Sequence, residues 1–270
     1  MMAKTGVDGR LAGKRAVVLG AAGRDNMGQA VARRFHAEGA RVTVAGRHED
    51  ELQHLACELD GHAVLADITI PADMAELTRQ SAALMGGIDI AVNATGWGLL
   101  KPFLETTTDE LSRMTALQFT GPFIFFQEII RAMTEGGSII QISSATATIM
   151  LNDHAAYMGT KAGTDHLIRC VAHEFGARGI RANSISPGLT DTPMNAEARK
   201  IPGLFEAFVA AYPLGRIGTK EDIAAAAVWL AGDECFMTGQ NLQVNGGLTL
   251  RRNPTREEMQ HAIAAASAPA

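Results

Sequence analysis

The sequence is poor in cysteine. Its three cysteines, Cys57, Cys170 and Cys235, lie far apart in a chain of 270 residues and form no CxxC pair. A disulfide framework needs an even, patterned set of cysteines, and a structural zinc site needs clustered ligands. We therefore expect neither a disulfide framework nor a metal site, and we interpret the three thiols as buried apolar side chains.

Long apolar runs and a surplus of basic residues are absent too. No run of about 18 apolar residues, the length that spans a bilayer, occurs in the chain. Residues 1–15 lack the apolar segment of a secretion signal. The formal net charge of -5 gives no basic field for a phosphate backbone or an anionic lipid surface. The sequence thus predicts a cytoplasmic protein that acts on small molecules, without nucleic-acid or membrane partners.

The sequence does contain a regular alternation of two patterns. Short apolar runs rich in valine and isoleucine have the character of buried strands and alternate with stretches of helical periodicity. The strand-like runs are residues 16–19, 42–45, 63–66, 88–92, 139–142, 180–185 and 242–244. The helical stretches are residues 28–38, 49–59, 72–84, 109–133, 154–175 and 220–230. This order predicts an α/β fold: one Rossmann-type, doubly wound parallel sheet of about seven strands flanked by helices, with ligands at the carboxyl ends of the strands.

No repeat or linker divides the chain, so residues 1–270 are predicted to form a single domain with a core at about residues 11–250. Residues 189–215 interrupt the alternation, and we interpret them as a lid over the substrate. In residues 251–270, Asn253-Pro254 is a helix-start signal and the end is rich in alanine, which predicts a short helix that frays. A tail that covers a neighbouring subunit's site is the alternative.

A glycine-rich loop follows the first predicted strand and leads into a helical stretch. Glycines let the backbone turn sharply beside a pyrophosphate, and the unpaired N–H groups at the start of the helix attract the anion. The loop therefore indicates a dinucleotide site, although an ordinary strand-to-helix turn is the alternative for the loop alone. Its candidate cofactor-binding residues are Gly20, Gly23, Arg24, Asn26, Met27 and Gly28.

The second predicted strand indicates which dinucleotide binds. An acidic residue about 20 positions past the loop would bind the ribose 2′-hydroxyl of NAD, whereas an arginine would bind the 2′-phosphate of NADP. The strand ends in Gly46-Arg47-His48, and no carboxylate comes before Glu49. Arg47, helped by Arg24, therefore predicts NADP(H) rather than NAD(H). The alternative for Arg47 is a solvated residue that precedes a helix.

A serine, a tyrosine and a lysine form the candidate catalytic set. Ser144 follows a predicted strand, while Tyr157 and Lys161 are four residues apart and share one face of the next predicted helix. A phenol has a pKa of about 10, and a nearby ammonium group lowers that pKa. We interpret Tyr157 as the proton donor and acceptor, Lys161 as the group that lowers its pKa, and Ser144 as the group that holds the substrate oxygen during hydride transfer.

With Asn93-Ala94-Thr95-Gly96 and residues 183–188, these motifs resemble the short-chain dehydrogenase/reductase family over about residues 11–247. The spacing of 13 residues from Ser144 to Tyr157 is the family's. The resemblance implies an NADP(H)-dependent ketoreductase of the 3-oxoacyl-reductase type, in which Lys161 also holds the nicotinamide ribose and Asp67 touches the adenine. The cofactor contacts that it implies beyond the loop are Asp67, Ile68, Asn93, Ala94, Gly96, Tyr157, Lys161, Pro187, Gly188, Thr190 and Thr192.

The sequence departs from the family pattern in three places. The span from Gly20 to Gly28 is longer than usual and resembles the enoyl reductase branch, but that branch places its tyrosine and lysine farther apart than Tyr157 and Lys161. Asn-Ala-Thr-Gly replaces Asn-Asn-Ala-Gly at residues 93–96. Gln118 stands where the family has an asparagine that helps hold a water in the proton relay. We include Gln118 as a fourth catalytic residue, which either preserves the relay or displaces the water.

Mostly apolar residues are expected around the open side of the nicotinamide: Trp97, Met150, His154, Met194 and Phe205. They predict a hydrophobic, uncharged ketone or secondary alcohol, although several can instead pack the lid. Residues 109–133 and 154–175 are more apolar than a monomer needs, and the resemblance implies a homotetramer. The open alternatives are a 3-oxoacyl-carrier-protein reductase, an enoyl reductase and, in another class, a non-catalytic NADP-binding regulatory protein.

Overall fold

The computed structural model describes residues 9–267, and strands and helices alternate along them as the sequence predicts. Seven strands form one parallel sheet in the order β3-β2-β1-β4-β5-β6-β9. Their bounds are β1 Arg15–Leu19, β2 Arg41–Gly46, β3 His62–Leu65, β4 Ile90–Asn93, β5 Gly137–Ile142, β6 Ile180–Pro187 and β9 Asn241–Val244. The strand order reverses between β1 and β4, and such a switch point opens a crevice at the carboxyl ends of the strands. The predicted doubly wound α/β fold is therefore confirmed.

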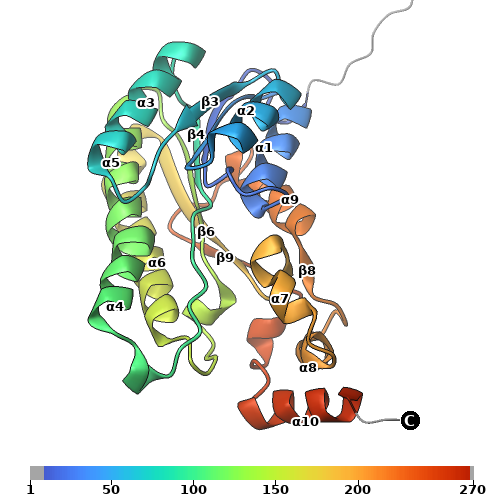
Figure 1. The fold of residues 1–270 in the computed structure, drawn as a ribbon. Helices are drawn as coiled ribbons and strands as arrows, with labels where there is room; N and C mark the ends of the chain where they lie inside the picture. The colour runs from blue at the N-terminus through green and yellow to red at the C-terminus, as the bar shows by residue number, and fades with distance from the viewer. Residues whose placement is uncertain (1–8, 268–270) are drawn as a thin grey trace, which may run out of the picture.

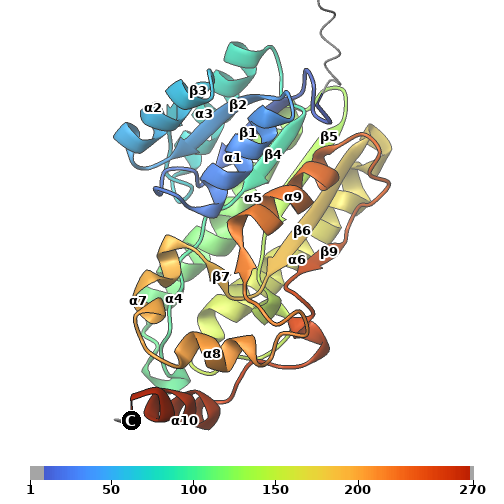
Figure 2. The same ribbon diagram turned by 90° about the vertical axis from the view of Figure 1, so that its right-hand side faces the viewer.

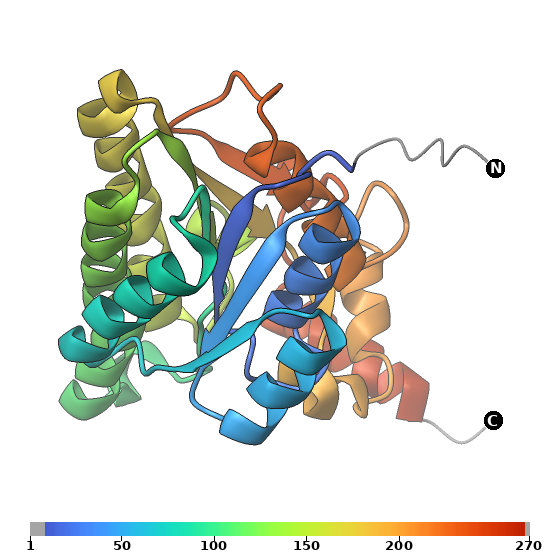
Figure 3. The ribbon, with the colours of Figure 1, turned by 90° about the horizontal axis from the view of Figure 1, so that it is seen from above.

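Helices cover both faces of this sheet (Figures 1 and 3). One face carries α1 Met27–Ala37, α2 Glu49–Glu58 and α9 Lys220–Ala231, and the other carries α3 Pro71–Met85, α5 Gly121–Ala132 and α6 Ala155–Phe175. Each face buries its own apolar cluster. The predicted helix over residues 109–133 is in fact two helices, because α4 Thr108–Thr115 joins α5 through a π-helical turn at Ala116–Thr120.

The segments that interrupt the alternation gather at the end of the molecule where the strands finish (Figure 2). Residues 189–215 contain the short elements β7 Thr190–Asp191, α7 Ala196–Arg199 and α8 Leu204–Val209, and β7 pairs with β8 Gly218–Thr219. The predicted C-terminal helix is present as α10 Arg256–Ser267, and the fraying predicted for the last residues lies outside the described part of the chain. Single 3-10 turns occupy Phe103–Glu105, Ala145–Ala147, Gly176–Arg178, Pro193–Asn195 and Leu248–Leu250.

The cysteines differ from the sequence-based interpretation. Cys235 is buried and Cys170 half-buried, but Cys57 is exposed, so the expectation of three buried thiols is wrong for Cys57. It lies near the end of α2, whose buried face carries Leu52, Leu55 and Ala56. A residue next to Ala56 on a helix points about 100° away from that face, which places the thiol in solvent. Within residues 9–267, no helix is long and apolar enough to cross a membrane.

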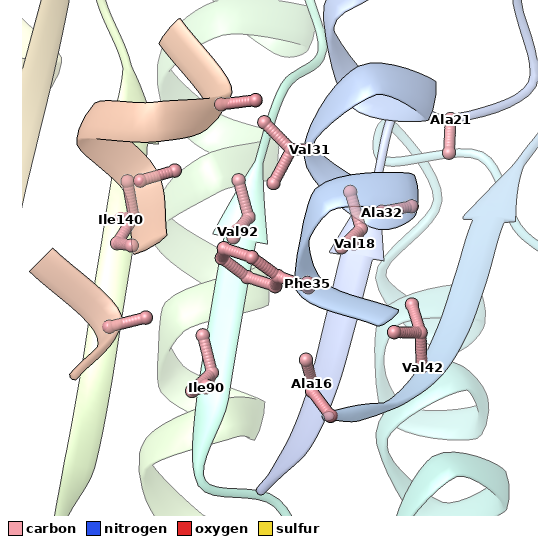
Figure 4. Close-up of a cluster of buried hydrophobic side chains, with 14 of the residues drawn as sticks. Ala16, Val18, Ala21, Val31, Ala32, Phe35, Val42, Ile90, Val92 and Ile140 are labelled. Carbon is pink, nitrogen blue, oxygen red and sulfur yellow. The ribbon is translucent and has the colours of Figure 1, made fainter. Parts of the chain in front are cut away.

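Phe35 anchors the cluster between α1 and the sheet. Its side chain has no exposed area, and Figure 4 shows its ring above the sheet beside Val18 and Val92. These contacts fix α1, and the first turn of α1 borders the glycine loop. The core on this face therefore determines where the start of α1 points.

We expect Phe35→Ala to lower the free energy of unfolding by about 3–5 kcal/mol, because it removes buried area and leaves a cavity. Urea denaturation of the purified protein measures the change. Phe236→Ala is the matched control, since the Phe236 side chain is 105% exposed and its loss should change stability by less than about 0.5 kcal/mol. A similar loss for both variants would contradict the role assigned to Phe35.

Candidate active site

The four candidate catalytic residues reach one place from three elements. Ser144 follows β5, Tyr157 and Lys161 lie on the first two turns of α6, and Gln118 lies in the π-helical turn. The Lys161 Nζ is 5.7 Å from the centre of the Tyr157 ring. Gly96, after β4, marks the shared space, because a Cβ there would lie 3.3 Å from Gln118 Oε1 and 3.9 Å from Lys161 Nζ. The structure therefore brings the whole predicted set together.

Ser144 is held in a fixed orientation. Its backbone is extended, with φ -159°, and its Oγ lies 2.8 Å from Thr146 Oγ1 and accepts a bond of 3.2 Å from the Thr146 N–H. Its carbonyl accepts from Ser186 Oγ at 3.1 Å. The Ser144 hydroxyl also interacts with the Tyr157 phenol and favours the charged form of that phenol.

Burial controls the protonation of Tyr157 and Lys161. Burial raises the pKa of the Tyr157 phenol, and the interaction with Ser144 only partly opposes it. Burial lowers the pKa of the Lys161 ammonium to about 8, against the attraction of Asp165. The expectation that Lys161 brings the Tyr157 pKa below its ordinary value is therefore wrong for the protein alone. Loss of water around the ring is the largest effect on the Tyr157 pKa, and the Asp165 carboxyl adds to it.

His154 supports the Tyr157 ring from one side. The two rings are stacked, with centres 4.2 Å apart and planes inclined by 25°. His154 Nδ1 is 2.7 Å from the Leu99 carbonyl oxygen, and burial lowers the pKa of the imidazole. Since a carbonyl only accepts, Nδ1 carries the proton and Nε2 is a hydrogen-bond acceptor. His154 is therefore a neutral group that presents one acceptor.

The amide of Gln118 joins the walls of the site. Its Nε2 donates to Thr160 Oγ1 at 3.0 Å and contacts Met114 Sδ at 2.8 Å, while its Oε1 accepts from the Trp97 N–H at 3.3 Å. The residue is 2% exposed. Its backbone carbonyl accepts from Thr164 on α6. The longer side chain of glutamine thus reaches groups on α4, α6 and the segment after β4.

The glycine loop has the shape that a pyrophosphate site needs. Gly20 has φ +98°, and a Cβ there would lie 2.6 Å from the Ala94 carbonyl carbon, so only glycine fits. The Asn26 side chain donates to the Gly20 carbonyl at 2.8 Å and accepts from the Gln29 N–H at 2.9 Å. It therefore braces the loop and caps α1. The first turn of α1 carries no acidic residue that would repel an anion.

The longer loop has a partner of its own. Asp25, with φ +59°, forms an ion pair with Lys220, the first residue of α9. This interaction lowers the pKa of the Asp25 carboxyl. Arg24 is exposed, and Met27 begins α1. The additional length therefore attaches the loop to a neighbouring helix.

Arg47 and Asp67 lie side by side at the ends of β2 and β3. The Arg47 guanidinium is 3.6 Å from Asp67 Oδ2, and the Arg47 side chain is 59% exposed. Asp67 Oδ1 accepts from the N–H and the hydroxyl of Thr69 at 2.9 and 2.8 Å. Burial raises the pKa of Asp67, but the bonds from Thr69 and Arg47 outweigh it and lower the pKa. Ile68 is buried beside them.

The segment after β6 is shaped by Tyr212, which the sequence did not single out. A Cβ at Gly188 would lie 2.2 Å from the Tyr212 hydroxyl, and that hydroxyl accepts from the Leu189 N–H at 2.5 Å. Burial raises the pKa of Tyr212 to about 12, so it is a structural phenol. Thr190 Oγ1 donates to the Gly188 carbonyl at 3.0 Å. The other predicted cofactor contacts here, Pro187 and Thr192, lie at the end of β6 and just after β7.

Asn93 ties the sheet together below the site. Its Nδ2 donates to Gln141 Oε1 at 2.8 Å, and its Oδ1 accepts from the N–H and the hydroxyl of Thr95 at 3.1 and 2.8 Å. Ala94 follows and packs against Gly20. Thr95, one of the two residues at which the Asn-Ala-Thr-Gly motif departs from the family pattern, therefore adds a hydroxyl bond to this turn.

The predicted substrate residues differ in their surroundings. The Arg113 guanidinium carbon lies 4.4 Å from the centre of the Trp97 ring. The Arg199 guanidinium carbon lies 5.8 Å from the centre of the Phe205 ring. Met150 and Met194 are 68% and 61% exposed. Met194 faces Gly98, because a Cβ there would lie 3.6 Å from its sulfur. The lid therefore comes close to the segment after β4. Ile149 and Phe208, by contrast, pack against Tyr212 in a small core.

Asp165 is a second residue that the sequence analysis missed. It lies one turn beyond Lys161 on α6, and burial raises the pKa of its carboxyl, although Ser184, Ser143 and Lys161 favour the charged form. Its Oδ2 accepts from Asn241 Nδ2 on β9 at 2.6 Å. The spacing of four from Lys161 was the available signal, since it puts both residues on the same helical face.

Known proteins share this arrangement. Residues 20–249 match the family model described as enoyl-(acyl carrier protein) reductase. Glucose 1-dehydrogenase from Gluconobacter oxydans is 34% identical over 251 residues, which are 89% of this chain and 94% of that protein. 3beta-hydroxysteroid dehydrogenase 1 from Eggerthella lenta is 35% identical over 89% of this chain and 95% of its own. A short-chain type dehydrogenase/reductase from Mycobacterium ulcerans has a structure with a TM-score of 0.88 at 29% identity, covering 94% of this chain and 98% of that one.

The chain belongs to the short-chain dehydrogenase/reductase family. It is an oxidoreductase, and dehydrogenases of this family act on small molecules with NAD(P)(H). The residues present fit that cofactor. The Gly20 turn and the start of α1 would hold the pyrophosphate, Arg47 and Asp67 would lie at the adenosine end, and Lys161 with the Gly188 turn would lie at the nicotinamide end.

Burial of Lys161 makes stability depend on pH. Lys161 is only 3% exposed, and the pKa of its ammonium group is about 8 rather than 10.5. Below pH 8 the folded state holds a desolvated charge that the unfolded chain leaves in water, at a cost of about 3 kcal/mol. Between the two pKa values the unfolded state binds the additional proton, so stability rises with pH.

We expect Lys161→Met to raise the free energy of unfolding by up to about 3 kcal/mol at pH 7 and by almost nothing near pH 10.5. Urea denaturation of the protein without cofactor at both pH values measures this. Lys200→Met is the control, because Lys200 is 69% exposed. A variant less stable than the parent at pH 7 would show that the charge is not the dominant cost.

Proposed function

We propose that this chain is an NADP(H)-dependent alcohol dehydrogenase and ketoreductase that interconverts a secondary alcohol and a ketone. The observation that carries the proposal is the convergence of Ser144, Tyr157 and Lys161 at the carboxyl end of β5, on the edge of the sheet where the glycine loop also lies. A phenol, a hydroxyl and an ammonium group there suit a reaction in which an oxygen gains or loses a proton.

Each side chain has one task in this reaction. The nicotinamide ring of the cofactor supplies or accepts hydride when it is bound. Ser144, fixed by Thr146, donates a hydrogen bond to the substrate oxygen and keeps it beside the Tyr157 hydroxyl. Tyr157 passes its proton to that oxygen in the reducing direction and takes it back in the oxidising direction. Lys161 holds the ribose hydroxyls and replaces the proton on Tyr157.

Gln118 completes this arrangement. It lies on the Lys161 side of Gly96 and its amide bonds to Thr160, so it keeps α6 and the segment after β4 at a fixed separation. We propose that its amide takes the place of the family's relay water. The raised pKa of Tyr157 keeps the phenol protonated until cofactor and substrate are in place, which suits a proton donor.

Carbonyl chemistry is favoured over enoyl reduction by the spacing of the catalytic pair. Tyr157 and Lys161 are four residues apart on α6, so both reach the same substrate oxygen and ribose. The matching family model carries the name of an enoyl reductase, but the two relatives described above are named as dehydrogenases of alcohol groups. A 3-oxoacyl substrate would use the same mechanism. A non-catalytic role would give no reason for a buried Lys161.

We expect Tyr157→Phe to lower kcat for ketone reduction at least about 100-fold, because the proton donor is lost. NADPH consumption with a panel of neutral ketones measures the rate, and fluorescence titration should show unchanged NADPH binding. Tyr212→Phe removes the other tyrosine hydroxyl of the chain and is the matched control. It should reduce stability by about 1–2 kcal/mol and retain most of kcat. A Tyr157→Phe enzyme as active as the parent would refute the mechanism.

The preference for NADP(H) rests on Arg47. Its side chain is exposed at the end of β2, beside Asp67, and no other carboxylate of the described site approaches it within ion-pair distance. An exposed guanidinium group there is suited to bind a 2′-phosphate in bidentate fashion. Asp67, already bonded to Thr69, remains available to the adenine.

We expect Arg47→Ala to raise the KM for NADPH at least about 10-fold and to leave the KM for NADH almost unchanged, since a charge-assisted bond is worth about 1.5–3 kcal/mol. Steady-state kinetics with both cofactors measures the ratio. Arg79→Ala is the control, because the Arg79 side chain is 68% exposed and pairs with Glu76 on its own helix α3. A parent enzyme that prefers NADH would refute the role of Arg47.

The substrate is proposed to be an uncharged, mainly apolar ketone or secondary alcohol. Trp97, Met194 and Phe205 supply the apolar walls, and the neutral His154 presents Nε2 as an acceptor for one hydroxyl group. Arg113 is already engaged on the face of Trp97. The two relatives are named for a sugar and a steroid, so the family scaffold accommodates both polar and apolar molecules.

We propose a homotetramer that works in the cytoplasm. Apolar side chains on α4, the π-helical turn and α5 are exposed in the single chain, namely Leu111 (48%), Phe119 (37%) and Phe123 (42%). Exposed apolar side chains on adjacent helical turns are typical of subunit contacts. The three cysteines are free, which suits a reducing compartment.

A further inference from the structure

The C-terminal segment lies beyond the part of the chain that matches the family model. That match ends at residue 249, and residues 251–267, which we name the strap, follow it. The strap is an ordered unit. The Thr255 N–H donates to Glu258 Oε2 at 2.7 Å, the Glu258 N–H donates to Thr255 Oγ1 at 3.2 Å, and Arg252 donates twice to the Glu258 carboxylate at 2.7 Å. This capping box starts α10.

The strap binds the loop that leads into the catalytic helix. Asn253 is 5% exposed, and its Nδ2 donates to the Met150 carbonyl at 3.0 Å. Arg256 forms an ion pair with Asp153. We call residues 150–154 the catalytic loop, because His154 is its last residue and stacks on Tyr157. Two side chains of the strap therefore hold both ends of this loop.

Asp153 contacts both the strap and the segment that follows β4. It has φ +61°, a left-handed conformation that aspartate tolerates better than most residues. Its carbonyl accepts from the Lys101 N–H at 2.6 Å, and the next residue, His154, donates to the Leu99 carbonyl. The Arg256 ion pair is thus attached to the residue that fixes the position of His154.

The strap also holds the lid. Gly203, at the start of α8, has φ +79°, and a Cβ there would lie 2.4 Å from the Ala262 carbonyl of α10. Arg251 donates to the Ala210 carbonyl just after α8 at 3.2 Å. Figures 1 and 2 both show α10 beside α8 at the same end of the molecule. One segment therefore contacts the lid and the catalytic loop together.

We propose that Asn253 and Arg256 are positioning residues, which act through the catalytic loop to keep His154 stacked on Tyr157. The proposal rests on the proposed function, because it assigns the strap to the reaction of Tyr157. The Arg256 and Asp153 side chains are 48% and 31% exposed, so their ion pair adds little to overall stability. Its effect is on the geometry of the loop.

The test compares Arg256→Gln, Asn253→Ala and the conservative Arg256→Lys in the full chain. We expect Arg256→Gln and Asn253→Ala to lower kcat about 10-fold, since small displacements of catalytic groups cost up to about 100-fold in rate. Arg256→Lys retains the ion pair and should recover most of kcat. NADPH binding by fluorescence titration should stay close to that of the parent in all three variants. The melting temperature should stay close to the parent's in the two Arg256 variants and fall in Asn253→Ala, which leaves the Met150 carbonyl without its partner.

A double-mutant cycle identifies the partner. Asp153→Asn keeps the left-handed conformation and removes the charge, so it should lower kcat like Arg256→Gln. The double variant should be no worse than either single variant. Glu257→Gln is the control, because Glu257 is an exposed strap residue that does not contact the catalytic loop. Additive effects of Asp153→Asn and Arg256→Gln, or an equal loss in Glu257→Gln, would overturn the proposal.

Hydrogen–deuterium exchange separates the failure of this proposal from the failure of the proposed function. Faster exchange over residues 148–158 in Arg256→Gln and Asn253→Ala, but not in Glu257→Gln, is expected whichever substrate the enzyme uses. Unchanged exchange and unchanged kcat in both variants would overturn the strap proposal while Tyr157→Phe still tests the function. Full activity of Tyr157→Phe with altered loop exchange would reject the proposed function and leave the strap contact established.

Discussion

The ammonium group of Lys161 is held almost entirely out of water, and much of the site is arranged around that one charge. Its Nζ donates to the Ile142 carbonyl at 2.8 Å, at the residue where β5 ends. Asp165 lies one turn further along α6 and compensates part of the charge. Gly96 also borders the amine, since a Cβ there would lie 3.9 Å from the Lys161 Nζ.

The elements around this charge are irregular. A buried cation must be surrounded by oxygen atoms, and regular helices and strands have already used theirs. The end of β5, the turn after β4 and the π-helical turn at Ala116–Thr120 each release or redirect a polar group toward α6. The site is therefore built at the points where regular structure stops, and two separately packed cores hold those points in place.

The sequence was sufficient for what depends on local patterns. Seven apolar runs between helical stretches predict the sheet and both helical layers, and the glycine turn at Gly20 and the spacing of Tyr157 and Lys161 predict where the site forms. These features follow from periodicity, which is a property of neighbouring residues. The order of the strands does not follow from this alternation, because doubly wound sheets with right-handed crossovers occur in more than one strand order.

The features that the sequence did not predict depend on contacts between distant segments. Nothing near Tyr212 indicates that its hydroxyl fills the space above Gly188, and nothing near Asn253 indicates that it reaches Met150. The direction of the Tyr157 pKa was also missed, because motif spacing reports the neighbours of a group but not its loss of water. Cys57 was misplaced for a related reason, since composition does not tell which face of α2 a thiol occupies.

The π-helical turn between α4 and α5 determines how this helix pair would respond to the loss of one residue. A π turn contains one residue more than an α turn, so removing a single residue would allow α4 and α5 to become one continuous helix. In that helix, everything before the deletion would rotate by about 100° relative to everything after it. Phe125, Phe126 and Ile129 would stay in the core, but Gln118 and Met114 would turn away from α6. The π-helical turn thus accommodates one additional residue, and it keeps the buried side chains of α4 and of α5 each facing the core.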